Sequence, residues 1–324
     1  MISLKKQLAI SIRILALLFT LSLCRSAWGY SELIVFGDSL SDTGNLASAT
    51  TNFPWPYYNN RVSNGPLAVD VLASAFGLSA EPSFHLVSSS GGGNFAVDGA
   101  NASGIDAQDL QIQRQAHLSR HADQIVKDAL YVVMIGGNDL RAARNEDSEV
   151  VAHSIADDAA AEISSTLSTL LQLGATKVLV VNAPDIGRVP ETLQKSQQDP
   201  GIKARSTTLT RRFNAALGAN IRSLRSQYGA AIVEFDLFTY FNKILDSPLT
   251  YGFTNIDEGC FNPNNYSFHT DCLYGQEFDR FVFFDSIHPT AKTHKLIGEA
   301  MVLAVRQSAQ KKTHVAPILM LLLN

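Results

Sequence analysis

Residues 36–45 read FGDSLSDTGN, and the first of them is the last residue of the apolar run 33–36. Ser39 therefore stands just after a predicted buried strand, where a following helix points its unpaired N–H groups at charge that develops beside it. Nucleophilic serines are built at such places, so Ser39 is the first candidate for a catalytic residue. The stretch alone is weak support, because Ser or Asp after a strand is also the usual helix N-cap.

Apolar segments of two kinds alternate along the chain. Four are short and rich in Val, Ile, Leu and aromatic residues, as buried parallel strands are: 32–36, 130–135, 177–182 and 231–235. Three repeat apolar residues at spacings of three or four, as amphipathic helices do: 154–173, 209–224 and 290–307. This alternation predicts an α/β fold, with a parallel sheet covered by helices on both faces. Ligands bind beyond the carboxyl ends of such strands, where Ser39 and Asn138 are both expected.

Three further segments extend the signal of the first: NFAVDGAN (94–101), VVMIGGNDL (132–140) and FFDSIHPT (283–290). Together with FGDSLSDTGN they resemble, in identity and in order, the four blocks of the GDSL hydrolases, also called SGNH hydrolases. The resemblance implies a three-layer α/β/α sandwich with a central parallel sheet. It is closest to the bacterial secreted branch that contains lysophospholipases A, phospholipases A and glycerophospholipid:cholesterol acyltransferases.

A serine hydroxyl is a weak nucleophile and needs a base within hydrogen-bond reach. His288 is the candidate base, because a neutral imidazole can accept the Ser39 proton and return it to the leaving alcohol. Asp285 would accept a hydrogen bond from the other ring nitrogen and fix the required tautomer. The order Ser, Asp, His also occurs in α/β-hydrolases, but their Gly-x-Ser-x-Gly motif is absent, since Ser41 replaces its last glycine.

The resemblance also implies an oxyanion hole, formed by the backbone N–H groups of Ser39 and Gly99 and the side-chain amide of Asn138. One position departs from the common family pattern. Asp98 stands where the lipolytic relatives commonly have a second glycine, which bears on the local turn and on substrate preference. Because the chain itself supplies nucleophile, base and oxyanion donors, we expect no cofactor and no metal.

His117 and His121 lie four residues apart on a predicted helix, a spacing that suits two metal ligands. The glutamate of a zinc-protease motif is missing. The pair therefore predicts a solvated helix face.

The N-terminus predicts a secretory signal. Lys5, Lys6 and Arg13 precede a short apolar stretch, and small residues precede an expected cleavage after Gly29. A lipid anchor on Cys24 is the second interpretation. The resulting organisation is a signal peptide over 1–29, a hydrolase domain over 30–310 and a short apolar tail over 311–324. We expect a secreted protein, extracellular or periplasmic.

The charge of the mature chain argues against nucleic acid as a partner. Removal of residues 1–29 leaves 22 basic and 30 acidic residues, a net charge of −8. An acidic chain without a basic cluster lacks the electrostatic footprint that nucleic-acid binding requires.

Cys260 and Cys272 are the two cysteines that follow the predicted signal peptide. In an oxidising compartment they are expected to form a disulfide. A metal site is a poorer interpretation, because no second pair of suitably spaced ligands accompanies them.

Half of the aromatic residues of the chain lie between Phe235 and Phe284, several of them inside the expected disulfide loop. Such a loop could line an apolar acyl channel or touch a lipid surface transiently. With the resemblance, this predicts a serine esterase or lipase that hydrolyses (lyso)phospholipids through an acyl-serine, with acyl transfer to a sterol as a second reaction. Two alternatives remain: a carboxylesterase acting on acetylated glycans, and a noncatalytic surface-binding protein.

Overall fold

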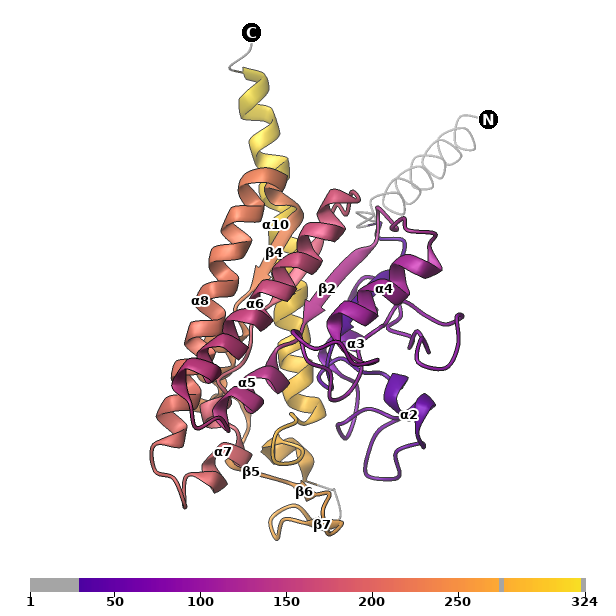
Figure 1. Ribbon diagram of the computed structural model, residues 1–324. Coiled ribbons are helices and arrows are strands. Elements are labelled where there is room, and N and C mark those ends of the chain that lie inside the picture. The colour runs from indigo at the N-terminus through magenta and orange to yellow at the C-terminus, as the bar shows by residue number, and fades with distance from the viewer. Residues whose placement is uncertain (1–28, 274–276, 322–324) are drawn as a thin grey trace, which may run out of the picture. The chain divides into compact units, whose positions relative to one another are not determined.

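The computed structural model of the protein describes residues 29–273 and 277–321 (Figure 1). The predicted signal peptide lies outside the described residues except for Gly29. Residues 322–324 of the predicted tail also lie outside them.

The central sheet consists of four parallel strands in the order β1-β2-β3-β4. They are β1 (Leu33–Gly37), β2 (Leu130–Met134), β3 (Val178–Val181) and β4 (Ile232–Phe235). Their residues are buried except for Glu234, as expected when helices cover both faces of a parallel sheet. All four strands lie where the sequence predicts them, and their carboxyl ends share one edge.

Residues 93–97 extend the sheet beside the free edge of β1 without forming a regular strand. The backbone N–H of Val35 donates to the Gly93 carbonyl at 3.0 Å, and that of Phe95 donates to the Val35 carbonyl at 2.8 Å. The N–H of Val97 then reaches the Gly37 carbonyl at 3.2 Å. The second sequence block therefore runs parallel to the first and ends at the same edge.

Helices cover both faces of the sheet, so the predicted three-layer α/β/α sandwich is confirmed. One face packs against α4 (Leu110–Arg120), α5 (Gly137–Arg144), α6 (Glu149–Gln172) and α8 (Ile202–Tyr228). The other carries α3 (Ala68–Ala75), α9 (Leu237–Asp246) and α10 (Ala291–Leu321) (Figure 1). Two short helices, α2 (Asn45–Ala49) and α7 (Pro190–Lys195), lie in the connections after β1 and β3.

The helices are longer than their apolar patterns predicted. Helix α6 begins at Glu149, because the Ser148 hydroxyl caps it by accepting the Val151 N–H at 3.4 Å. Helix α10 continues beyond the predicted end and through Pro317 to Leu321. None of the helices in the described part of the chain has both the length and the apolarity that a membrane span requires.

The connection between α9 and α10 carries the aromatic segment and the disulfide. Its strands are β5 (Asn255–Gly259), which pairs in parallel with β8 (Phe281–Phe283), and the antiparallel pair β6 (Phe261–Asn262) and β7 (Ser267–Phe268). The expected disulfide joins Cys260 to Cys272, whose Cα atoms are 5.5 Å apart. Both cysteines are fully buried in an aromatic cluster that includes Phe261, Phe278, Phe281 and Phe284.

Removal of this disulfide, by the double variant Cys260→Ser/Cys272→Ser, is expected to lower the free energy of unfolding by up to about 3 kcal/mol. The bond closes a loop of 12 residues and restricts the unfolded chain. Urea denaturation with and without reductant measures the effect, since reductant should shift the wild-type midpoint and leave that of the variant unchanged. Equal midpoints for wild type and variant in the absence of reductant would contradict the prediction.

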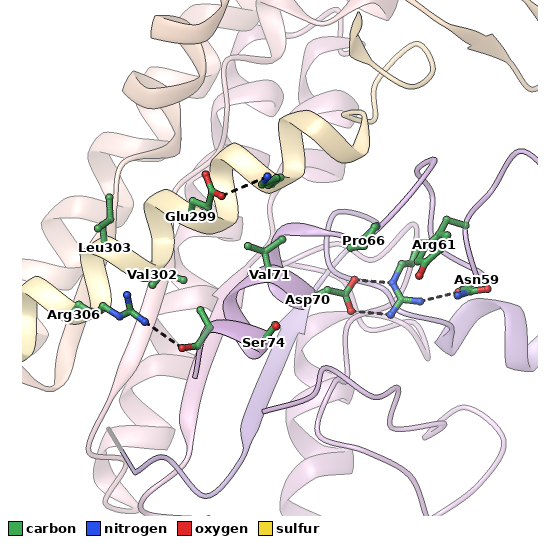
Figure 2. A pocket seen from close by; sticks show the side chains of 13 residues that line it. Asn59, Arg61, Pro66, Asp70, Val71, Ser74, Glu299, Val302, Leu303 and Arg306 are labelled. Atoms are coloured by element: carbon green, nitrogen blue, oxygen red, sulfur yellow. Dashed lines mark hydrogen bonds and ion pairs between the residues drawn. The ribbon is translucent and has the colours of Figure 1, made fainter. Parts of the chain in front are cut away.

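A groove of about 810 Å³ lies between α3 and α10, and Figure 2 shows the side chains that line it. Arg61 binds both carboxylate oxygens of Asp70 there, at 2.7 and 2.8 Å. Arg306 donates from Nη2 to the Ala75 carbonyl at 3.2 Å. None of the predicted catalytic residues lines this groove.

Candidate active site

Ser39 lies two residues beyond the end of β1, in a tight turn at the carboxyl edge of the sheet. The backbone N–H groups of Ser41 and Asp42 both donate to the Asp38 carbonyl at 3.0 Å. The Gln113 amide on α4 holds the start of this turn, because it accepts the Gly37 N–H at 2.9 Å and donates to the Gly37 carbonyl at 2.7 Å. The position of Ser39 is therefore fixed from both sides.

The structure brings Ser39 together with Asp285 and His288, which lie more than 240 residues later in the sequence. His288 Nε2 lies 2.9 Å from Ser39 Oγ, and His288 Nδ1 lies 2.8 Å from Asp285 Oδ2. Asp285 Oδ1 accepts the backbone N–H groups of Ile287 at 2.9 Å and His288 at 2.7 Å. The Asp285 carboxylate is thereby held against the ring, and the ring against the hydroxyl.

Asp285 and His288 shift each other's pKa values in opposite directions. Burial alone would lower the pKa of His288, but the adjacent Asp285 carboxylate raises it above its ordinary value. Burial alone would raise the pKa of Asp285, but His288 and the two backbone N–H groups bring it below its ordinary value. The arrangement therefore favours a charged carboxylate beside a ring that can accept a proton.

Asn138 lies on the first turn of α5, where the chain leaves β2. Its Nδ2 donates to the Ala100 carbonyl at 2.9 Å, and its Oδ1 accepts from Arg141 Nη1 at 3.1 Å. Arg141 therefore fixes which end of the amide is the donor. Ser39, Asn138 and His288 line one cavity of about 60 Å³.

Gly99 is not among the residues that line this cavity. Its φ of +83° lies in the left-handed region, which favours glycine. The backbone N–H of the preceding Asp98 donates to Asp42 Oδ2 at 2.9 Å, which ties the turn of Gly99 to that of Ser39. The role of Gly99 as an oxyanion donor stays a prediction.

Sequence reasoning missed a buried polar network that joins the first two blocks. Asp42 Oδ1 accepts the backbone N–H groups of Gly44 at 2.7 Å and Asn45 at 2.6 Å. Asn45 Nδ2 donates to the carbonyls of Asn94 at 2.8 Å and Ala96 at 2.7 Å. Buried polar side chains require such partners, so these residues hold the blocks in register. Their place inside the recognised blocks was the available signal.

A second missed group fixes the third block. Arg141 and Arg144 of α5 bind the Glu191 carboxylate of α7, at 2.8 and 2.7 Å. Burial would raise the pKa of Glu191, but the two guanidinium groups lower it to about 2. This ion-pair group holds Arg141 in the position from which it orients the amide of Asn138. No motif marks Glu191 in the sequence.

Two further carboxyl groups lie near the predicted catalytic residues. Asp38 lines the cavity, and burial raises its pKa to about 7 despite a hydrogen bond from the Leu40 N–H at 3.1 Å. Burial also raises the pKa of Asp98, and the nearby His288 opposes that shift. Asp98, which stands where the lipolytic relatives commonly have a glycine, therefore adds a carboxyl group near His288. This group ionises less readily than an exposed aspartate.

The prediction of a solvated face at His117 and His121 was wrong for His117. Its side chain is fully buried and packs against the rings of Phe36 and Phe95, at centroid distances of 5.7 and 5.4 Å. Burial lowers the pKa of His117 to about 3, so the ring is neutral. Within residues 29–273 and 277–321, no group of three His, Cys, Asp or Glu residues could hold a metal ion.

Known proteins resemble this chain in sequence and in structure. The GDSL-like lipase/acylhydrolase family matches residues 33–301. A GDSL esterase/lipase of Arabidopsis thaliana is 26% identical, over 88% of this chain and 91% of its own length. Lipase 1 of Photorhabdus luminescens is 26% identical, over 88% of this chain and 52% of its own.

Among solved structures, a catalytic mutant of an acetylxylan esterase from Geobacillus stearothermophilus is 14% identical. It aligns with a TM-score of 0.45, over 86% of this chain and 95% of that one. The family match alone spans most of the sequence. The chain therefore belongs to the GDSL-like lipase/acylhydrolase family and is a carboxylic ester hydrolase.

Proposed function

We propose that this protein hydrolyses acyl esters of (lyso)phospholipids through an acyl-serine intermediate on Ser39. The observation that carries the proposal is the hydrogen-bonded series from Asp285 through His288 to Ser39, at the edge of a small and largely apolar cavity. Such a series activates a hydroxyl for attack on a carbonyl carbon.

In the first half of the reaction, His288 Nε2 takes the proton of Ser39 Oγ as the oxygen attacks the ester carbonyl. The backbone N–H groups of Ser39 and Gly99 and the Asn138 amide donate to the resulting oxyanion. The intermediate collapses, His288 returns the proton to the leaving alcohol, and the acyl group stays on Ser39. In the second half, His288 takes a proton from water as the water oxygen attacks the acyl-serine. The bond to Ser39 Oγ then breaks, His288 returns the proton to Oγ, and the carboxylic acid is released.

Lipid as the substrate is supported by an apolar rim, defined here as Trp55, Tyr266, Phe268 and Leu273. Trp55, Tyr266 and Leu273 are 65%, 54% and 60% exposed, and exposed apolar groups that gather in one patch mark an interaction site. The ring of Trp55 lies 5.2 Å from that of Phe268. Amphipathic aromatic side chains favour the interface between water and lipid.

Ring contacts connect this rim to the catalytic residues. Tyr266 and Phe268 each pack on Phe261 at 5.3 Å, and Phe261 packs on Phe284 at 5.6 Å. Phe284 directly precedes Asp285. We infer that a transient contact of the rim with a membrane surface brings the enzyme to its lipid substrate. The name of the Photorhabdus relative, Lipase 1, agrees with this choice.

We further infer that the enzyme acts outside the cytoplasm, in the periplasm or the extracellular space. The pattern of residues 1–29 supports export, and so does a disulfide, because disulfides persist in oxidising compartments. The acidic balance of the chain speaks against nucleic acid as a partner.

The Asn138→Ala variant is expected to lower kcat by 10²-fold to 10³-fold, on the order of 3 kcal/mol, because one donor to the oxyanion is lost. KM should change little, since the donor acts mainly in the transition state. Steady-state kinetics on a soluble ester measure both values. Asn145→Ala, at the exposed end of the same helix, is the matched control. A raised KM with kcat unchanged would assign Asn138 to ground-state binding instead.

Acid release by the purified mature protein tests the proposed substrate. The panel comprises lysophosphatidylcholine, diacyl phosphatidylcholine, triacylglycerol and acetylated xylan, each with wild type and Ser39→Ala. Serine-dependent release mainly from lysophosphatidylcholine is expected, and cholesteryl ester formed when cholesterol is added would establish acyl transfer. Activity confined to acetylated xylan would overturn the lipid assignment and retain the catalytic residues. No release from any ester would favour a noncatalytic binding protein.

A further inference from the structure

A second cavity, of about 30 Å³, lies directly behind the catalytic cavity. The two share five lining residues, all of them apolar: Leu40, Met134, Pro184, Val189 and Ile287. These side chains are the partition between the two spaces. Met134 has three rotatable side-chain bonds and adapts its shape readily. Met134 can therefore change its shape at the partition without movement of the sheet.

The deeper cavity, called the inner compartment, lies among helices of one layer of the sandwich. Leu237 and Phe241 of α9 line it, together with Ile297 of α10 and Phe283 of β8. All four side chains are at most 4% exposed. The Phe241 ring packs edge-on against Phe283 at a centroid distance of 5.7 Å. The walls of this space are hydrocarbon and aromatic, which suits an apolar chain.

The inner compartment has one polar feature, the buried ring of His294. His294 Nδ1 accepts the Ala68 N–H at 3.3 Å, which places the ring proton on Nε2 of the neutral imidazole. Nε2 has no hydrogen-bond partner among the described residues. A buried donor without a partner is unfavourable in a closed core, so it indicates a space that a ligand or solvent enters.

We propose that the acyl chain of the substrate passes the partition into the inner compartment, and that Phe241 limits the length of chain the enzyme accepts. This inference rests on the proposed hydrolysis of acyl esters at Ser39. Entry past Ile287 starts one residue from His288, beside the reacting carbonyl. The leaving alcohol then remains on the outer side, toward solvent.

His294 disfavours chains that pass the limit set by Phe241. A hydrocarbon chain cannot give Nε2 the hydrogen bond that it lacks, whereas water can, so contact between the chain and this nitrogen weakens binding. Each methylene that is buried before the Phe241 limit should raise kcat/KM about fourfold. The wild-type profile is therefore expected to rise with chain length, pass through a maximum and then fall.

The test compares kcat/KM for p-nitrophenyl esters from acetate to palmitate in wild type, Phe241→Ala, Phe241→Leu and Phe241→Trp. The two truncations should move the maximum to longer chains, with at least about a tenfold gain in the ratio of long-chain to acetate kcat/KM for Phe241→Ala. Phe241→Trp should shift the maximum to shorter chains. Because the result is a ratio within one preparation, it does not depend on the fraction of protein that folds.

Phe253→Ala is the matched control, because this ring is also fully buried and lines neither cavity. Its profile should match that of the wild type. Profiles that stay unchanged in all three Phe241 variants, or that shift equally in Phe253→Ala, would overturn the proposal. Absence of Ser39-dependent hydrolysis for every ester would instead refute the proposed function on which it rests.

Discussion

Ser39→Ala is expected to reduce ester hydrolysis by about 10⁴-fold to 10⁶-fold while the fold is retained. The hydroxyl is the atom that would form the acyl-enzyme, and water cannot take its place at the same rate. The substitution removes a single oxygen whose hydrogen bond is to His288. Initial rates on a p-nitrophenyl ester, with circular dichroism and thermal unfolding of the same samples, separate loss of chemistry from loss of structure.

Ser41→Ala is the control for this variant. Ser41 belongs to the same turn and is fully buried, and its hydroxyl has no hydrogen-bond partner among the described residues. Its replacement should leave the rate within about threefold of wild type, since little is lost when an unpaired hydroxyl is removed. Wild-type turnover by Ser39→Ala would show that the nucleophile lies elsewhere.

Asp285→Asn is expected to lower kcat/KM by up to about 10⁴-fold, the size of effect known when the acid of a serine triad becomes an amide. An asparagine amide facing His288 Nδ1 favours the tautomer with its proton on Nε2. That nitrogen then cannot accept the proton of Ser39 Oγ. The measurement is kcat/KM at a pH where it no longer rises with pH in either protein. There His288 is neutral in both, so the difference reports the tautomer and not a change in the pKa of His288.

The pH dependence gives Asp285→Asn a second signature. His288 must be neutral to act as a base, so activity rises as pH increases through its pKa, and the Asp285 carboxylate raises that pKa. Without the carboxylate, the acid limb of kcat/KM should move to lower pH. Wild-type and variant profiles between pH 4 and 9 measure the shift. An acid limb in the same place in both proteins would assign the limb to another group.

The strands could be predicted because their signals are local. Segment 130–135 is apolar throughout, and no helix pattern competes with it. Ser39 and His288 lie in short blocks that are informative together, through the identity and order of their residues, and their catalytic roles stay predictions. The hydrogen bonds of 2.8 and 2.9 Å among Asp285, His288 and Ser39 are the arrangement expected from those identities.

Features that depend on pairing across the chain could not be predicted. Residues 93–97 begin at the last of three glycines and show no strand-like alternation. They lie beside β1 because their backbone groups form hydrogen bonds with those of Val35. His117 is polar by type, and its burial follows from packing on Phe36 and Phe95, which adjoin it only in the folded protein.

The inner compartment is a similar case. Phe241 and His294 lie more than 50 residues apart in sequence and meet only because α9 and α10 cover the same face of the sheet. Phe241 alone indicates a core residue, and His294 alone indicates a polar position on a helix. Their proposed contact with the acyl chain follows from the cavity that both line, which adjoins the cavity lined by Ser39.

The most direct test of the central claim is covalent labelling of Ser39. Purified mature protein is treated with a fluorophosphonate carrying an alkyl chain, digested and mapped by mass spectrometry, with Ser39→Ala in parallel. We predict one adduct per chain, on the peptide that contains Ser39, formed together with the loss of ester hydrolysis and absent from the variant. An adduct on another residue that abolishes activity, or full activity after complete labelling of Ser39, would contradict the account.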